Sequence, residues 1–187
     1  MDIPTGHALL KRLKDNDEDA LESIFHAFYP LVYKSTLKLV SDVQVAEDLC
    51  QNVFLKLWEK RQQLQIEGPI LPYIKRMAIN EALSHLRKQP KFNTEEIDEQ
   101  SISLVSVDTD QPYLDGELRK AVQQAIAQLP PKCQTIYKLS RFEELSYKEI
   151  AKKMELSPKT VENQMSIAFK MLRKWLSNYL KCFFIFF

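Results

Sequence analysis

Apolar residues recur along almost the whole chain at the three- and four-residue spacing of an amphipathic helix, and this period constrains the fold more than any other feature. Alternating apolar and polar residues, which are typical of half-buried strands, are nearly absent. The chain has only three glycines in 187 residues; Gly6 and Gly68 lie outside the periodic segments, and Gly116 lies at the start of one. We therefore predict an all-α fold. The expected helices span residues 7–14, 17–40, 43–63, 71–88, 115–128, 132–142, 146–154 and 158–180.

Several residues that start, stop or bend helices divide these segments. Asp17 and Ser41 are suited to cap helices, because their side-chain oxygens accept hydrogen bonds from backbone N–H groups. Pro30 has no N–H group and is expected either to kink the second helix or to end it and begin a new one. Gly68 followed by Pro69 predicts a turn.

Residues 93–112 have no helical period and are rich in acids and serine. This composition predicts a linker between two small helical domains, at residues 1–92 and 113–187. A structured edge strand within residues 101–107 is the alternative that the sequence leaves open.

Charge is strongly segregated along the chain, although the formal net charge is only +1. Residues 73–91 carry five bases against one acid, and residues 146–181 carry eight bases against three acids. Between these basic segments, residues 93–117 carry eight acids and no base. A polyanion could therefore bind both basic segments, while the acidic segment would be repelled from it.

The last third of the chain has the signature of a helix-turn-helix. Ser146 is suited to cap a short helix, and residues 155–156 make the turn. Ser157 offers a second cap before Pro158, which suits the first position of a helix because no N–H group is needed there. The inward-facing residues of the two helices follow a helical period. They are Ile150, Ala151, Met154, Val161, Met165, Ala168 and Leu172.

The opposite face of the second helix is long, polar and basic, as a helix in the major groove of DNA requires. Bases near the ends of this face would contact phosphates, while its central polar residues are placed to contact base edges. A solvated helix pair in a bundle is the alternative, but the two caps, the small Ala151 and the surplus of bases together favour DNA. The residues assigned to duplex DNA are Lys159, Thr160, Glu162, Asn163, Ser166, Lys170 and Arg173.

Two segments of the first half carry groups suited to binding. On the helix at 43–63, Leu55 shares the outward face with polar residues, which suggests a protein contact, although a scattered exposed leucine is common. Residues 73–88 combine aromatic, amide and basic groups. Rings of this kind stack on unpaired bases while cations hold the backbone, and an amphipathic helix with a basic rim is the alternative.

Three segments together resemble the extracytoplasmic-function (ECF) group of RNA polymerase sigma factors. They are AEDLCQNVFLKLW (46–58), PYIKRMAINEALSHLRK (72–88) and the segment from LPPKCQ to KMLRK (129–174). They follow the order and spacing of that family over nearly the whole chain. The last segment is shared with response-regulator activators, whereas the first two are specific. The resemblance implies a region 2-like domain at 1–92, a region 4-like domain at 113–187 and a function in transcription initiation.

The resemblance also implies a role for each helical surface. The helix at 43–63 would dock on the coiled coil of the core polymerase clamp, through Asp48, Gln51, Asn52, Leu55 and Trp58. The next helix would engage the non-template strand of the downstream promoter element as it opens, through Tyr73, Lys75, Arg76, Asn80, Arg87 and Lys88. The helix from Pro158 would recognise the upstream element as duplex. A membrane-linked anti-sigma factor is a further partner that the resemblance implies.

The sequence departs from the family pattern at a few positions. Asn52 stands where the family usually carries glutamate, and Glu162 and Gln164 stand where many members carry basic groups. Residues 160–164, TVENQ, resemble the branch found in Bacteroidetes-type bacteria, which implies an altered base preference.

Two other classes of function compete with this interpretation. A helix-turn-helix regulator that is not a polymerase subunit would need a ligand-binding or phosphoacceptor domain, and the first half shows no pattern for either. An enzyme is disfavoured because no phosphate loop, metal-ligand spacing or nucleophile–base pattern occurs among the three histidines and three cysteines. We therefore expect no catalytic residue, metal or cofactor.

The cysteines and the chain ends predict a cytoplasmic protein. Cys50, Cys133 and Cys182 lie far apart, which favours free thiols in a reducing compartment. The first residues carry acids early and do not resemble a signal peptide. The terminal segment at 183–187, FFIFF, is far too short to span a bilayer, and the sequence does not distinguish packing on the second domain from contact with a regulator or disorder.

Overall fold

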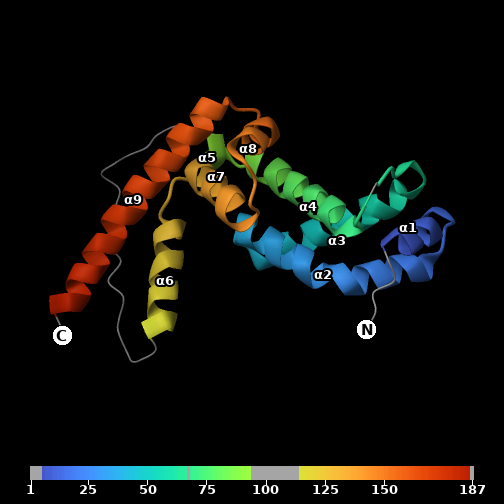
Figure 1. Cartoon of the computed structure of the whole chain (residues 1–187), viewed down its shortest axis with the longest axis horizontal. Helices are drawn as coiled ribbons and strands as arrows, with labels where there is room; N and C mark the ends of the chain where they lie inside the picture. Colours follow the sequence, from blue (N-terminus) through green and yellow to red (C-terminus); the bar gives the residue numbers. More distant parts are fainter. Residues whose placement is uncertain (1–5, 67, 94–113, 186–187) are drawn as a thin grey trace. The chain divides into compact units, whose positions relative to one another are not determined.

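The computed structural model describes residues 6–66, 68–93 and 114–185 of the chain. All regular structure in these ranges is helical, which confirms the predicted all-α fold (Figure 1). The helices form two compact units, residues 1–89 and residues 90–187. The predicted linker and the alternative strand at 101–107 fall outside the described residues almost entirely, so the domain limits at 92 and 113 stay predictions.

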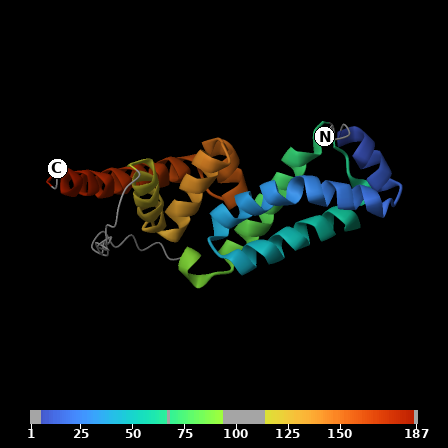
Figure 2. The ribbon, with the colours of Figure 1, turned by 90° about the horizontal axis from the view of Figure 1, so that it is seen from below.

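The first unit is a bundle in which α2, α3 and α4 pack against one another and α1 packs on α2 (Figures 1 and 2). Its elements are α1 (Gly6–Lys14), α2 (Glu18–Val40), α3 (Val43–Glu59), the 3-10 turn η1 (Arg61–Gln63) and α4 (Ile70–Arg87). The inward face predicted for α3 is confirmed. Its buried residues are Ala46, Leu49, Cys50, Val53, Phe54 and Leu57.

The connection between α2 and α3 corrects one predicted cap. Asp17 caps α2 as expected, because its Oδ1 accepts from the N–H of Ala20 at 3.2 Å. Ser41 instead ends α2 in the left-handed region at φ 60°. Asp42 then caps α3, with its Oδ1 accepting from the N–H of Val45 at 3.0 Å. Ser41 is thus not the cap of α3, because the tight connection uses it to end the preceding helix.

The second helix runs unbroken through Pro30, so the prediction that it ends there and a new one begins is wrong. Pro30 has no N–H group, so the carbonyl oxygen of His26 lacks the hydrogen bond that it would otherwise accept from residue 30. Phe28 and Val32 are buried on either side of the proline, within a buried face that continues along the helix. Tertiary packing therefore outweighs the missing hydrogen bond.

The predicted helix at 43–63 is shorter than expected. It ends at Glu59, and residues 61–63 form the tighter turn η1. The predicted turn before α4 is present, and Gly68 adopts φ 128° there, a conformation that favours glycine.

The second unit is arranged around a long C-terminal helix, on which α6, α7 and α8 pack. Its helices are α5 (Pro90–Asn93), α6 (Leu114–Ala127), α7 (Pro131–Phe142), α8 (Tyr147–Met154) and α9 (Pro158–Ile185). A core of Ala125, Ile126, Leu129, Cys133, Ala168 and Leu172 joins α6, α7 and α9. The one-turn helix α5 was not predicted, and α9 extends beyond residue 180. The placement of the side chains at 183–187 lies outside the described residues.

Candidate nucleic-acid interface

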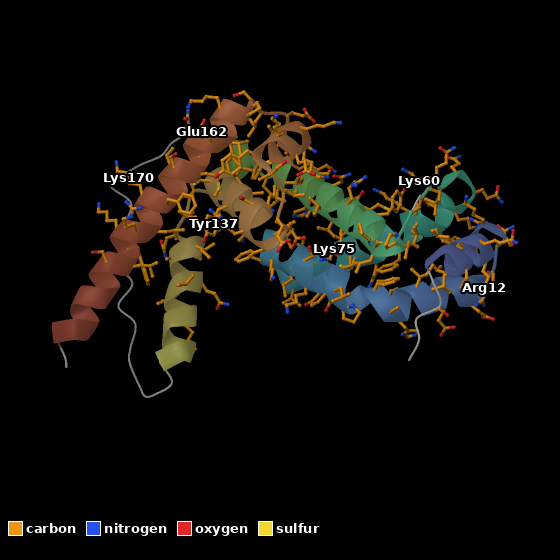
Figure 3. The ribbon with its side chains drawn as sticks, in the orientation of Figure 1. Arg12, Lys60, Lys75, Tyr137, Glu162 and Lys170 are labelled. Carbon is orange, nitrogen blue, oxygen red and sulfur yellow. The ribbon has the colours of Figure 1, made fainter. Side chains whose placement is uncertain are left out.

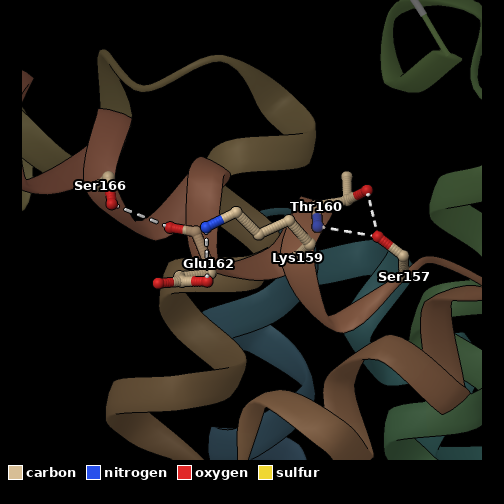
Figure 4. A network of polar contacts seen from close by, with 5 residues as sticks. All are labelled: Ser157, Lys159, Thr160, Glu162 and Ser166. Carbon is tan, nitrogen blue, oxygen red and sulfur yellow. Dashed lines mark hydrogen bonds and ion pairs between the residues drawn. The ribbon is translucent and has the colours of Figure 1, made fainter.

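The helix-turn-helix of the second unit is built as the sequence predicts. Ser146 and Glu149 form a reciprocal capping box, in which Oγ of Ser146 accepts from the Glu149 N–H at 3.3 Å and Oε2 of Glu149 accepts from the Ser146 N–H at 2.9 Å. Glu155 makes the turn at φ 57°. Oγ of Ser157 then accepts from the N–H of Thr160 at 2.9 Å, and α9 begins at Pro158 (Figure 4). These caps fix where the second helix starts.

The buried side of this motif determines which side chains face outward. The predicted inward residues Ile150, Ala151 and Met154 are buried on α8, and so is the whole predicted stripe of α9. That stripe consists of Val161, Met165, Ala168 and Leu172. The opposite side of α9 is therefore left facing solvent.

We call this outward side of α9 the reader face. Its members are exposed and, at about 100° per residue, fall within roughly one third of the helix circumference. They are Lys159, Glu162, Asn163, Ser166, Lys170 and Arg173. Thr160 lies at the edge of this face and is half-buried. In Figure 3, Glu162 and Lys170 lie along one side of α9, while Tyr137 lies between α7 and α9.

Local contacts organise the first turns of the reader face (Figure 4). Nζ of Lys159 donates to Oε2 of Glu162 at 3.0 Å, one turn along the helix. Oγ of Ser166 donates to the backbone carbonyl of Glu162, also at 3.0 Å. Within the described part of the chain, the side-chain amide of Asn163 makes no hydrogen bond, so its donor and acceptor both point to solvent.

A second polar strip runs along α4. Tyr73, Arg76, Asn80 and Arg87 lie within about 60° of one another around the helix axis. Lys75 lies about 160° from Tyr73, so it is not on the same face as the other predicted contacts. Tyr73 is half-buried against the core of the first unit, while Arg76, Asn80 and Arg87 are exposed. The remaining predicted contact, at residue 88, is exposed at the end of the helix.

The single acid of this basic segment is bound to a neighbouring helix. Nζ of Lys56 on α3 donates to Oε1 of Glu81 on α4 at 2.6 Å. The ammonium group of Lys56 thereby offsets the negative charge of Glu81, whose side chain is only 24% exposed. Its charge therefore weakens the basic character of the α4 surface little.

A third surface lies on α3, where Asp48, Gln51, Asn52 and Leu55 are all exposed. Leu55 is 55% exposed, a large value for an aliphatic side chain, whereas the nearby Leu57 is fully buried. Trp58 is half-buried, and the guanidinium of Arg61 lies 4.0 Å above the centroid of its ring. The structure thus brings together all five residues predicted to contact the polymerase.

Leu55 and Trp58 also line a shallow groove between α2 and α3, with a volume of about 450 Å³. The α2 side of the groove was missed by the sequence reasoning, which considered the start of α2 only as a capped helix end. The lining residues on α2 are Glu18, Asp19, Leu21, Glu22 and Phe25. Their three- and four-residue spacing, with acids and apolar residues interleaved, is the signal that could have identified this rim.

The described residues show neither a cluster of metal ligands nor a membrane-spanning helix. No group of three or more potential ligands among their histidines, cysteines and acids could hold a metal ion. None of their helices is long and apolar enough to cross a bilayer. Cys50 and Cys133 are free thiols, as predicted, and both are buried, while the side chain of Cys182 lies outside the described residues.

Comparison with known proteins matches most of the chain to one family. A family model described as Sigma-70 region 2 matches residues 24–92, and one described as Sigma-70, region 4 matches residues 119–172. The ECF RNA polymerase sigma factor SigW of Bacillus subtilis is 25% identical over 178 residues, covering 90% of this chain and 95% of SigW. The RNA polymerase sigma-H factor of Pseudomonas aeruginosa is 26% identical over 182 residues, covering 92% and 94%. The chain belongs to the sigma-70 family, in its ECF group.

Two solved structures show a similar fold. This sigma factor aligns with CnrH, in complex with the cytosolic domain of CnrY, at a TM-score of 0.56 and 14% identity, over 94% of this chain and 99% of that one. It also aligns with the sigma factor RpoE of Bartonella quintana, in complex with the anti-sigma factor NepR. The TM-score is 0.54 and the identity 20%, over 83% of this chain and 96% of that one. The protein is a sigma factor for transcription initiation, and members of its family are in general not enzymes.

Proposed function

We propose that this ECF sigma factor binds core RNA polymerase through α3 and recognises promoter DNA through α4 and α9, without covalent chemistry of its own. The observation that carries the proposal is that each of these three helices has one buried side and one exposed polar side. Each has a buried stripe that fixes its orientation and an exposed polar strip on the other side. The three strips differ in chemistry, as three different partners require.

The α3 surface suits a protein partner. An exposed leucine surrounded by Asp48, Gln51 and Asn52 offers an apolar contact with a polar rim, which is the usual anatomy of a protein interface. The groove beside Leu55 and Trp58 extends this surface onto α2. We assign it to the coiled coil of the polymerase clamp.

The α4 surface is suited to bind an unpaired DNA strand. The half-buried ring of Tyr73 is held in place by the core, and exposed Arg76 and Arg87 on the same side can bind the sugar-phosphate backbone. Asn80 lies between them and can contact a base edge. Because Lys75 lies on the other side of α4, we assign it a separate backbone contact. Together with the residue at 88, these side chains would hold the non-template strand of the downstream element.

The reader face of α9 suits duplex DNA. It begins at a capped helix end, and its first turns carry polar groups while Lys170 and Arg173 follow further along. Residues near the start of the second helix of such motifs contact base edges, and bases around them contact phosphates. We assign this face to the upstream promoter element.

Transcription with purified components tests the proposal. The full chain is mixed with core RNA polymerase and a library of genomic fragments, and run-off transcripts are sequenced. We expect transcripts from a defined set of sites at which core polymerase alone is inactive. A chain that binds DNA but neither co-purifies with core polymerase nor supports initiation would instead be a helix-turn-helix regulator that is not a polymerase subunit.

Three finer assignments belong to the same proposal. The segment TVENQ at 160–164 supports membership of the Bacteroidetes-like branch. The complexes of CnrH with CnrY and of RpoE with NepR support an anti-sigma partner for this chain too, and we propose a membrane-linked one. Binding to polymerase and buried free thiols at Cys50 and Cys133 support a cytoplasmic location.

A further inference from the structure

The reader face carries an acid in a position where DNA phosphates repel it. Glu162 lies in the second turn of α9, and its side chain is 56% exposed. Its neighbours on the face are Lys159, Asn163, Ser166 and, one turn further, Lys170. A carboxylate at this point lowers the affinity for every DNA sequence unless it makes a favourable contact with a base.

The carboxylate of Glu162 contacts one neighbouring cation and still has acceptor capacity (Figure 4). Nζ of Lys159 binds Oε2 at 3.0 Å, which orients the side chain and offsets its charge. Within the described part of the chain, Oε1 accepts no hydrogen bond. The hydroxyl hydrogen of Ser166 is directed to the Glu162 carbonyl, so Ser166 does not compete for the carboxylate.

The base edges of the major groove determine what such a group can recognise. A carboxylate only accepts hydrogen bonds, so it is repelled by the acceptors of guanine (O6 and N7) and thymine (O4). Cytosine offers the N4 amino donor without an acceptor of its own beside it. Adenine offers the N6 amino group next to the acceptor N7, which is less favourable for two carboxylate oxygens.

We propose that Glu162 selects a cytosine in the upstream promoter element by accepting a hydrogen bond from its N4 amino group. Lys159 acts as a positioning residue, which fixes the carboxylate and reduces its repulsion from the phosphates. The inference rests on the proposed role of α9 in reading duplex DNA. On this inference, Glu162 determines which base is preferred, and its negative charge does not abolish DNA binding.

The test is a selection from duplex DNA randomised over the upstream element, performed with the full chain alone and with the chain bound to core polymerase. Wild type is compared with Glu162→Gln, which keeps the size of the side chain but adds an amide donor. Glu144→Gln is the matched control, because this exposed acid lies in the same unit but outside α9. Lys159→Ala tests the positioning residue.

Wild type should select cytosine at one position, and Glu162→Gln should reduce that preference by at least about fivefold, as expected for one lost base contact. The preference at the other positions should be unchanged, and Glu144→Gln should behave as wild type. Lys159→Ala should retain the cytosine preference with a smaller ratio, and Lys159→Arg should restore it.

Two results would overturn the inference: no cytosine preference in wild type, or the same preference in Glu162→Gln. Failure of initiation by wild type with core polymerase would instead count against the proposed function. Because the selection on the full chain alone does not require polymerase, it still decides the role of Glu162 in that case.

Discussion

Lys170 and Arg173 lie on the reader face beyond the polar groups of its first turns, where exposed cations are suited to contact phosphates. Replacing both with alanine should weaken binding to promoter DNA of any sequence, since phosphate contacts carry no sequence information. The slope of log affinity against log salt should fall by about one per lost contact. Binding titrations at several salt concentrations measure this, with Lys11→Ala in the first unit as control. An unchanged slope would exclude these side chains as phosphate contacts.

Asn163 is adjacent to Glu162, and its side-chain amide is available to a ligand. An asparagine that donates to and accepts from an adenine edge contributes about 1–3 kcal/mol of discrimination. Asn163→Ala should therefore relax the preference at one position of the upstream element. Competition binding with single-base variants of a selected site provides the measurement. Gln44→Ala, at an exposed amide of α3 that is assigned to no partner, serves as control, and an equal effect of that variant would indicate an indirect cause.

Leu55 is exposed on α3, where an aspartate would stay hydrated without disturbing the core. Leu55→Asp should therefore abolish co-purification with core polymerase while the melting temperature stays near that of wild type. Leu31→Asp is the matched control, because Leu31 is similarly exposed, at 47%, on α2. Early melting of Leu55→Asp would show that this leucine is structural instead.

Sequence reasoning worked for single residues where a helical period decides the outcome. The buried stripes of α3, α8 and α9 and the exposure of Leu55 follow from spacing alone. It failed where three-dimensional detail decides. The choice of Asp42 over Ser41 as cap depends on the conformation of the residue between two helices, and the groove beside Leu55 depends on how α2 packs on α3.

At the scale of the helix, the capping box of α8 sets the position of the turn that leads into α9. Ser146→Ala removes the acceptor for the Glu149 N–H and should destabilise α8 by about 1 kcal/mol. Hydrogen exchange at the backbone amides of α8 in the full chain measures this locally. Ser146→Thr keeps the acceptor and should retain protection. Equal loss of protection in both variants would point to a packing defect rather than a lost cap.

The spacing of apolar residues predicts most of the helices, whereas some details of the helices depend on tertiary packing. Eight of the helices were predicted because their apolar residues repeat over at least two turns. The short α5 was not, since four residues contain no period; its Phe92 is nevertheless buried. Pro30 does not break α2, because the buried residues around it belong to a core that forms only in the folded chain.

At the scale of the whole molecule, the order of charges along the chain is the feature with most consequence. Basic α4 and basic α9 belong to different units, and the eight acids of residues 93–117 separate them in sequence. Covalent connection raises the effective concentration of the second unit once the first has bound. A basic connection of the same length would compete for DNA, whereas an acidic one is repelled from it.

Replacing the six acids of residues 93–112 with the corresponding amides tests whether the charge of this connecting segment matters. The variant should bind random DNA more tightly and initiate less efficiently with core polymerase, because the connecting segment would then no longer be repelled from DNA. Run-off transcription and filter binding with random-sequence DNA measure the two effects. A second variant with residues 93–112 in shuffled order keeps the charge and length and should initiate as wild type. Full initiation by the neutral variant would show that the segment acts through its length alone.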